Sequence, residues 1–384
     1  MRQAYQIIPV YTADVSGVCS ALYELGGMTV MHDPSGCNST YNTHDETRWY
    51  HQDSLIFLSG LTERDAIMGD DKRFLRDVAS AARQLEPRFI ALASSPIPFL
   101  NGTDFPALAR LIERETGIPA FFVPTSGMHD YVQGAGMALA AVARRFVDEP
   151  AGVTPRSVNL LGVTPLDFAG EGSAESLRRR MTDAGWEVIS CWAMGDTLDA
   201  LVKAGAAQVN LVTSSVGLAA AKVLKERFGT PYVVGTPIGG FAETIFAAME
   251  RAGATGTDAV AYLSRPEGKA KATLIGEPVT MGSLAAAISR KYGVPTRVLC
   301  PLENWSGLLA PGDSAVAGEE AAAMALADAE IVIADPLYRP VCSENSRFYE
   351  LPHQAFSGRC FRKKMPNLFE IWRDSNGTER YAFG

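Results

Sequence analysis

The strongest constraint on the fold is a local pattern that recurs along the whole chain. A short β-branched run ends in a loop of Ser, Thr, Pro or Gly, and a helical pattern follows, as in RFIALASS before PIPFLNGTDFPALARLIERETG and QVNLVTSS before VGLAAAKVLKERFG. Strands that alternate with helices of about ten to fifteen residues predict βαβ units and parallel sheets. Such sheets bind ligands at the carboxyl ends of their strands, where these loops lie.

The chain is too long for one core. Its 384 residues predict two or three domains. Composition changes at VDEPAGVTPRS (147–157) and at LSRPEGKAKA (263–272). We therefore predict an α/β protein of three Rossmann-like domains with mostly parallel sheets, at residues 1–150, 151–268 and 269–384, with a cleft between the domains.

Composition excludes several classes of function. The net charge of −8 disfavours a nucleic-acid partner, because phosphate binding needs clustered positive charge. No apolar window is long enough to span a bilayer, and the N-terminus has no signal core, so we expect a cytoplasmic protein without membrane partners. The sequence also lacks GxGxxG and GxxxxGK[ST], which disfavours standard nucleotide binding.

The stretch HDPSGC (32–37) raises the question of metal chemistry. It follows the apolar run GMTVM, which predicts a strand, and Cys19 lies 18 residues before Cys37. In a reducing compartment a disulfide is not expected. The two thiols are either buried small residues or metal ligands. Since an iron–sulfur cluster usually has four ligands, a cluster here would need a partner chain.

The order of several motifs resembles the nitrogenase component 1 family. Its members include light-independent protochlorophyllide and chlorophyllide reductases, cofactor-assembly scaffolds and a nickel-tetrapyrrole reductive cyclase. The family pattern of a cysteine, an apolar strand and HGPxGC is matched by Cys19, GMTVM and HDPSGC. LTERDAIMGDDKRFLRDV and ASSPIPFLNGTDF resemble the next two motifs, and GDTLDALVKAGAAQVNLVTSS resembles part of the second domain.

The resemblance implies a dimer with an iron–sulfur cluster at the subunit interface. An ATP-dependent iron protein would deliver electrons to this cluster, and they would pass to a small-molecule substrate between the domains. Cys19 and Cys37 match the first two cluster cysteines, whereas Ser95 stands at the third. A serine oxygen is a harder, poorer iron ligand. We therefore expect a 4Fe-4S cluster that bridges two subunits, either a homodimer or a pair with a paralogous component 1 subunit.

On the substrate side the chain departs further from the family. In nitrogenase a cysteine and a histidine hold the catalytic metallocluster, and the resemblance aligns them with Ser214 and His353. The alternatives for these residues are a loop hydroxyl and a structural histidine. An imidazole at His353 could ligate a metal or donate a proton. Arg359 could bind a substrate carboxylate. A second metallocluster or a tetrapyrrole in the cleft is thus possible, and dinitrogen is disfavoured as the substrate.

Two other functions fit the same sequence. The first is a non-catalytic scaffold on which a metallocluster or a tetrapyrrole is assembled. The second is a sugar- or metal-binding protein with a similar multi-domain plan, which would contain no iron. Cys342 and Cys360 flank His353 and are either packing residues or part of a further metal site.

Overall fold

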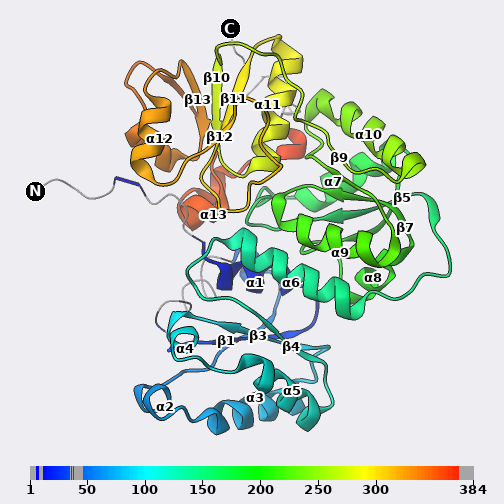
Figure 1. The fold of residues 1–384 in the computed structure, drawn as a ribbon, viewed down its shortest axis with the longest axis vertical. Helices are drawn as coiled ribbons and strands as arrows, with labels where there is room; N and C mark the ends of the chain where they lie inside the picture. Colours follow the sequence, from blue (N-terminus) through cyan, green and yellow to red (C-terminus); the bar gives the residue numbers. More distant parts are fainter. Residues whose placement is uncertain (1–5, 8–11, 35, 37, 39–45, 372–384) are drawn as a thin grey trace, which may run out of the picture.

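The computed structural model describes residues 6–7, 12–34, 36, 38 and 46–371. It contains three sheets, each within a separate stretch of the chain (Figure 1). All strand pairs within these sheets are parallel, which confirms the predicted fold class. Each of the ranges 1–150, 151–268 and 269–384 contains one sheet, and we propose this division into domains.

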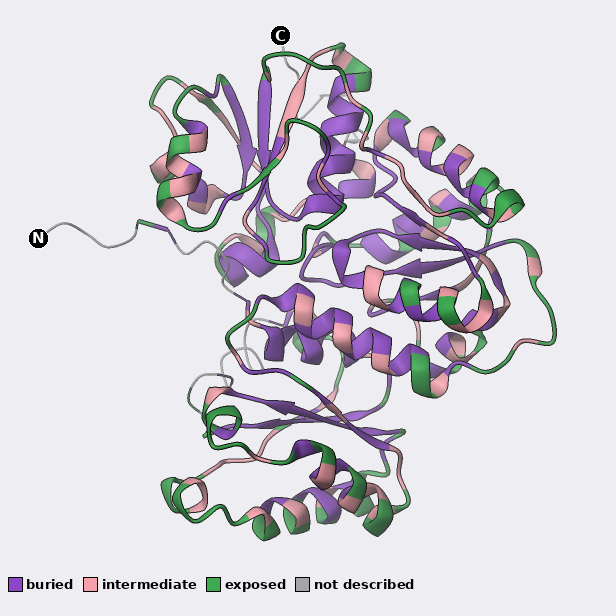
Figure 2. Cartoon of the chain, in the orientation of Figure 1, coloured by how far each residue is buried: buried purple, intermediate pink, exposed green. Residues whose placement is uncertain are grey.

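The first sheet has the strand order β2-β1-β3-β4. Its strands are β1 (Met28–His32), β2 (Leu55–Leu58), β3 (Ile90–Ser94) and β4 (Ala120–Val123). One face packs against α1 (Asp14–Leu22) and α6 (Tyr131–Phe146), and the other against α3 (Asp71–Leu85) and α5 (Phe105–Thr116). The short elements α2 (Glu63–Met68) and α4 (Pro96–Leu100) lie at its carboxyl edge, whereas η2 (Thr47–Tyr50) precedes β2 and contacts the end of α1. Figure 2 shows that α1 and α6 are mostly buried, whereas α3 and α5 have a solvent face.

The second sheet has the order β6-β5-β7-β8-β9. Its strands are β5 (Thr154–Leu161), β6 (Glu187–Cys191), β7 (Ala207–Val212), β8 (Tyr232–Val234) and β9 (Ala259–Val260). Its helices are α7 (Ser173–Asp183), α8 (Leu198–Leu201), α9 (Leu218–Phe228) and α10 (Ala242–Thr255), with η3 (Val202–Ala206), η4 (Ser215–Gly217) and η5 (Gly239–Phe241). Left-handed Gly229 ends α9 and Gly256 ends α10, a conformation that glycine adopts without a steric cost.

The third sheet has the order β12-β11-β10-β13-β14. Its strands are β10 (Ala272–Ile275), β11 (Thr296–Cys300), β12 (Ser314–Ala315), β13 (Ile331–Ala334) and β14 (Arg347–Glu350). Helix α11 (Pro278–Tyr292) covers one face and α12 (Glu319–Leu326) the other. After the sheet come α13 (Gln354–Ser357), η7 (Gly358–Lys364) and η8 (Leu368–Glu370), and η6 (Pro336–Val341) precedes β14. In Figure 1, α13 lies between the third sheet and the pair α1 and α6.

Helices α1 and α6 touch through backbone. A Cβ added to Gly17 would lie 2.2 Å from the carbonyl oxygen of Tyr131, and one added to Gly134 would lie 1.9 Å from that of Asp14. Real Cβ atoms do not approach so closely, so both positions require glycine. Asp14 also accepts hydrogen bonds from the amides of Ser126 and Gly127, which fixes the start of α1 at the carboxyl edge of the first sheet.

One hydrophobic cluster joins all three sheets. It runs from Val15 in α1 to Ile371 and includes strand residues of each sheet. Two smaller clusters lie outside it, one between the first sheet and the α3 and α5 layer, the other between the third sheet and α12. In the part of the chain that the structure describes, no helix is long and apolar enough to cross a membrane.

Candidate functional site

The loops after one strand of each sheet meet at a single buried contact. Tyr131 follows β4, Asp167 follows β5 and His353 follows β14. The Tyr131 hydroxyl donates to Asp167 Oδ1 at 2.5 Å, and His353 Nε2 lies 3.3 Å from the same oxygen. Thr164 Oγ1 donates to Asp167 Oδ2 at 3.3 Å. This contact is called the junction below, and it brings together side chains from three sheets.

Two buried carboxyl groups, those of Asp167 and Glu277, interact electrostatically at the junction. Glu277, at the start of α11, accepts hydrogen bonds from the amides of Ser215 and Thr280 at 2.8 and 2.7 Å. Burial, and next the negative charge of Asp167, raise the pKa of Glu277. The same two causes raise the pKa of the Tyr131 hydroxyl well above its usual value. Burial and the charge of Asp167 thus both favour the protonated form of Glu277, so the junction can hold a proton on this carboxyl group.

Hydrogen bonds fix the backbone of His353, whereas its imidazole ring makes none with the residues that the structure describes. Asp335 Oδ2 accepts from the His353 amide at 2.8 Å and from Ser357 Oγ at 2.7 Å. The ring packs on Phe356, with centroids 4.6 Å apart. Among the described residues Nδ1 has no polar partner, and Nε2 makes the 3.3 Å ion-pair contact with Asp167 but no aligned hydrogen bond, although His353 is only 7% exposed. An imidazole in this state can carry a proton or act as a ligand.

A cavity of about 820 Å³ lies against the same loop that carries Asp167. Pro165 and the run from Phe168 to Glu175 form one wall, and the N-terminus of α7 lies in this run. Other walls come from the first range of the chain and from the segment after α13. The lining residues outside the loop include Glu24, Arg48, His51, Met194, Arg362 and Lys363. This cavity lies between the ranges proposed as domains and is called the cleft below.

Arg48 ties the cavity wall to helix α1. Its guanidinium donates to Glu46 and Glu24, to the carbonyl and hydroxyl oxygens of Ser20, and to the carbonyl of Ala193 beyond β6. It also stacks on Tyr23, 4.5 Å from the ring centroid. An Arg fork with every direction occupied positions its neighbours rigidly, so Arg48 fastens the first sheet's region to the second.

The two predicted cluster cysteines differ in what the structure says of them. Cys19 lies in the middle of α1, fully buried, and burial followed by the nearby charge of Glu46 raises the pKa of its thiol. Cys37 lies outside the described residues. Ser95, at the end of β3, is also fully buried, and its Oγ has no hydrogen-bond partner among the described residues. The Ser95 amide donates to the carbonyl of His32 at 3.3 Å.

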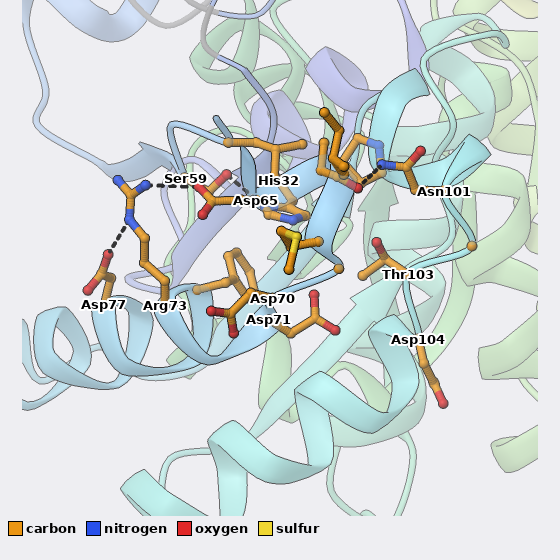
Figure 3. Close-up of a pocket in the computed structure, with 18 residues that line it drawn as sticks. His32, Ser59, Asp65, Asp70, Asp71, Arg73, Asp77, Asn101, Thr103 and Asp104 are labelled. Carbon is orange, nitrogen blue, oxygen red and sulfur yellow. Dashed lines mark hydrogen bonds and ion pairs between the residues drawn. The ribbon is translucent and has the colours of Figure 1, made fainter. Parts of the chain in front are cut away.

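His32 lines a second cavity, of about 520 Å³, at the carboxyl edge of the first sheet (Figure 3). Its Nδ1 lies 2.7 Å from Ser59 Oγ, which comes from the end of β2. Burial lowers the pKa of His32 to about 4, against the opposing charges of Asp33 and Asp65. Figure 3 shows the carboxylates around this cavity, of which Asp65 and Asp77 pair with Arg73. The others are Asp70, Asp71 and Asp104.

The remaining predicted residues are dispersed. Ser214, at the end of β7, is fully buried, and its hydroxyl donates to the carbonyl of Gly162 at 2.9 Å. Arg359 is exposed, and its neighbours Arg362 and Lys363 line the cleft instead. Cys360 is exposed and Cys342 is half-buried. Among the described residues, no group of three or more His, Cys, Asp or Glu side chains is arranged to hold a metal.

Sequence reasoning missed most of the junction. Tyr131, Asp167 and Glu277 were not singled out, and neither was Arg48. A usable signal existed for two of them, because Asp167 in LLGVTPLD and Glu277 in LIGEP follow apolar strand runs at carboxyl ends. The contact between the three sheets has no signal in a single sequence, since its partners are far apart along the chain.

The chain is similar in sequence to one protein family and to several of its characterised members. The family model of the nitrogenase component 1 type oxidoreductases matches residues 17–275. A light-independent protochlorophyllide reductase subunit of Prosthecochloris aestuarii is 28% identical over 216 residues, which are 55% of this chain and 40% of that protein. The nitrogenase iron-molybdenum cofactor biosynthesis protein NifE of Clostridium pasteurianum is 24% identical over 245 residues, 58% of this chain and 51% of that protein.

The solved structure Nitrogenase Cp1 at pH 6.5 has the same fold. It superposes with a TM-score of 0.69 at 17% identity, over 97% of this chain and 92% of that chain. The curated relatives are matched over about half of their own length or less. The family model, however, spans most of the present chain. The chain therefore belongs to the nitrogenase component 1 type oxidoreductase family.

Proposed function

We propose that this chain is a nitrogenase-like component 1 subunit that reduces a small molecule in the interdomain cleft. Electrons would come from an ATP-dependent iron protein through an interface iron–sulfur cluster. The observation that carries the proposal is the buried contact of Tyr131, Asp167 and His353, because the loop that bears Asp167 also lines a cavity of about 820 Å³ through Pro165 and Phe168. A reduction needs protons as well as electrons, and this loop would connect a buried polar contact with a space for substrate.

The proposed cluster would be shared between two subunits, with Cys19 and Cys37 of each chain as its ligands. In the structure Cys19 is fully buried in α1 and burial raises the pKa of its thiol, so a cluster would require this side chain to become accessible and deprotonated. Ser95, at the end of β3, has a buried hydroxyl without a hydrogen-bond partner among the described residues. Two thiolates from each of two chains complete the four ligands that such clusters take. The bound cluster would supply one-electron transfer. A homodimer or a pair with a paralogous subunit, in the cytoplasm, follows from this proposal.

The chain's own groups would prepare the substrate. Arg362 and Lys363 place positive charge at the cleft, where the lining also carries glutamates (Glu24, Glu171 and Glu175). The N-terminus of α7 lies on the same wall. The proton that the reduced substrate takes up would come from the junction, where burial and the charge of Asp167 raise the pKa of Glu277. Phe168 lies on the cavity wall next to Asp167 in the chain, so the junction and the cavity share one loop.

An exposed apolar patch suits docking of a partner. Ile67 and Met68 of α2 are 74% and 71% exposed, and Leu100 of α4 is 73% exposed. Exposed large apolar groups gathered at one edge often mark an interaction surface. The patch lies at the carboxyl edge of the first sheet, where His32 leads into the Cys37 stretch, so the iron protein would dock close to the cluster.

The test is iron analysis of protein purified without oxygen. We expect the wild-type protein to contain about two iron atoms per chain, half of a bridging four-iron cluster. Cys37→Ala should lose most of this iron and of the acid-labile sulfide. Cys342→Ala, a matched change of a half-buried cysteine outside the motif, should keep both. Full iron content in Cys37→Ala would overturn the proposal.

A non-catalytic scaffold is the second candidate. The similarity to NifE, a cofactor biosynthesis protein by name, covers 58% of this chain and favours it. The buried, hydrogen-bonded hydroxyl of Ser214, which stands at the family's cluster cysteine, fits a site that does not retain a metallocluster. Incubation with the iron protein, ATP and an artificial electron donor separates the two, because a scaffold should release no reduced small molecule.

A further inference from the structure

A third cavity lies at the opposite edge of the third sheet from the junction. It has a volume of about 590 Å³ and lies under the segment 263–270, which connects the second sheet to the third. The amino ends of β10 and β11 supply Thr273, Thr296 and Arg297 to its lining. Neither the proposed reduction nor the proposed cluster uses this edge.

One arginine of the cavity is already neutralised. Arg265 pairs with Asp313, and the two side chains are only 4% and 1% exposed. Asp313 also accepts from the amides of Val298 and Ala310, at 2.7 and 2.9 Å. Arg265 Nε is buried without a hydrogen-bond partner among the described residues, but the guanidinium charge is compensated by Asp313, and such a buried pair is a structural anchor. Arg265 therefore holds the 263–270 segment onto the sheet.

The other arginine lacks a counter-ion. Arg297 is half-buried, and its Nη2 donates to Thr273 Oγ1 at 3.3 Å and to the carbonyl of Ala325 at 2.7 Å. Its Nε is buried without an acceptor, and within the described residues it forms no ion pair. Desolvating a guanidinium without a paired anion costs free energy. An anion that entered the cavity would remove that cost.

Other groups of the lining suit an anion as well. Thr273 accepts a bond from Arg297 and keeps its own hydroxyl proton to donate. Lys269 lines the rim, and the nearby carboxylate of Glu330 already pairs with Lys271, which leaves the ammonium of Lys269 available to an incoming anion. The two acids of the lining, Glu267 and Asp328, are exposed, so water screens their charge far more than that of half-buried Arg297.

We propose that this cavity binds a small oxyanion, a molecule that carries a phosphate or carboxylate group, between Arg297 and Lys269. The planar fork of Arg297 matches such a group, and Lys269 adds a mobile charge at the entrance. The volume exceeds that of a bare phosphate, so a small phosphorylated or polycarboxylated metabolite would fit. Binding at this edge would fasten the 263–270 segment to the third sheet.

The experiment measures binding to the full-length protein by isothermal titration calorimetry, with inorganic phosphate and citrate as separate probes and sodium chloride at matched ionic strength. We expect saturable heat with phosphate, citrate or both, and none with chloride. Phosphate alone or citrate alone identifies the preferred group. Equal, non-saturating effects of all three salts would overturn the proposal. The result does not depend on iron content, so it is independent of the proposed reduction.

Two variants assign the site. Lys269→Ala changes an exposed side chain and should weaken binding about threefold to tenfold, whereas Lys222→Ala, an exposed lysine on α9, should leave it unchanged. Arg297→Lys keeps the charge without the fork and should weaken binding at least about tenfold. If Arg297 only tethers β11 to α12, Arg297→Lys would lower the unfolding midpoint and leave the anion affinity unchanged, which contradicts the proposal.

Discussion

The junction and the carboxyl edge of the first sheet occupy equivalent places in their sheets but are built in opposite ways. At the junction, Tyr131, Asp167 and His353 are buried, and each comes from a different sheet. At the edge of the first sheet, Ile67 and Leu100 are more than 70% exposed around an open acidic cavity. Both places follow the rule that ligands bind at carboxyl ends of parallel strands.

Under the proposed function, the difference would separate two tasks. A proton store must exclude water, and a docking surface must be free for a partner. The closed junction would serve the first task and the open edge the second. The following predictions test this division from the largest expected effect to the smallest.

The buried imidazole of the open edge should make stability depend on pH. His32 packs between Phe74 and Phe105, and burial lowers its pKa from 6.5 to about 4. The unfolded chain binds the proton near pH 6.5, so this contribution is complete above that pH and is lost as the pH falls toward 4. The loss should reach about 3 kcal/mol.

Urea unfolding midpoints between pH 4 and 7 measure this loss. His32→Gln should remove most of the slope, and His51→Gln, at an exposed histidine that lines the cleft instead, should preserve it. An unchanged slope in His32→Gln would assign the pH dependence to other groups and remove His32 from the comparison.

The closed junction should depend on one carboxylate. Asp167→Ala leaves the buried Tyr131 hydroxyl without its acceptor, which destabilises the fold, but it also relieves the repulsion between Asp167 and Glu277. The net result should be a free energy of unfolding that is lower by roughly 2 kcal/mol. Asp199→Ala, at an exposed ion pair with Arg88, should shift the unfolding midpoint far less. Equal shifts of the unfolding midpoint in the two variants would show that the Asp167 contact stabilises the protein no more than an exposed ion pair does.

A substitution at the open edge should leave the stability of the protein nearly unchanged but weaken binding of the partner protein. Met68→Ser should change the free energy of unfolding by less than about 0.5 kcal/mol, because the side chain is 71% exposed. It should nevertheless weaken binding of the iron protein, measured by biolayer interferometry. Met324→Ser, at a methionine of α12 that is 73% exposed, is the matched control and should bind as the wild type does. Equal binding by both variants would place the docking surface elsewhere.

Local patterns predicted the elements of both regions, while long-range contacts had to come from the structure. The run GMTVM became β1, one residue later along the chain, and Ser95 and Ser214 lie at strand ends as expected. His353 does lie in a loop at a carboxyl edge, in contact range of Asp167. Asp167 was not predicted, because its contacts with Tyr131 and His353 form only when the three sheets pack together. The ligand roles of Cys19 and Cys37 stay a prediction.

The hydrophobic cluster that runs through all three sheets determines how the protein should respond to truncation and heating. Because its members extend from Val15 to Ile371, cutting the chain near residue 150 or 268 would expose apolar surface on both fragments. The three sheets should therefore melt in one calorimetric transition, with slow amide exchange shared among them. The layer of α3 and α5, which has its own small cluster, can open separately and faster. Substitutions confined to the outer face of that layer should therefore affect stability locally, whereas a disruption of the shared cluster should destabilise all three sheets together.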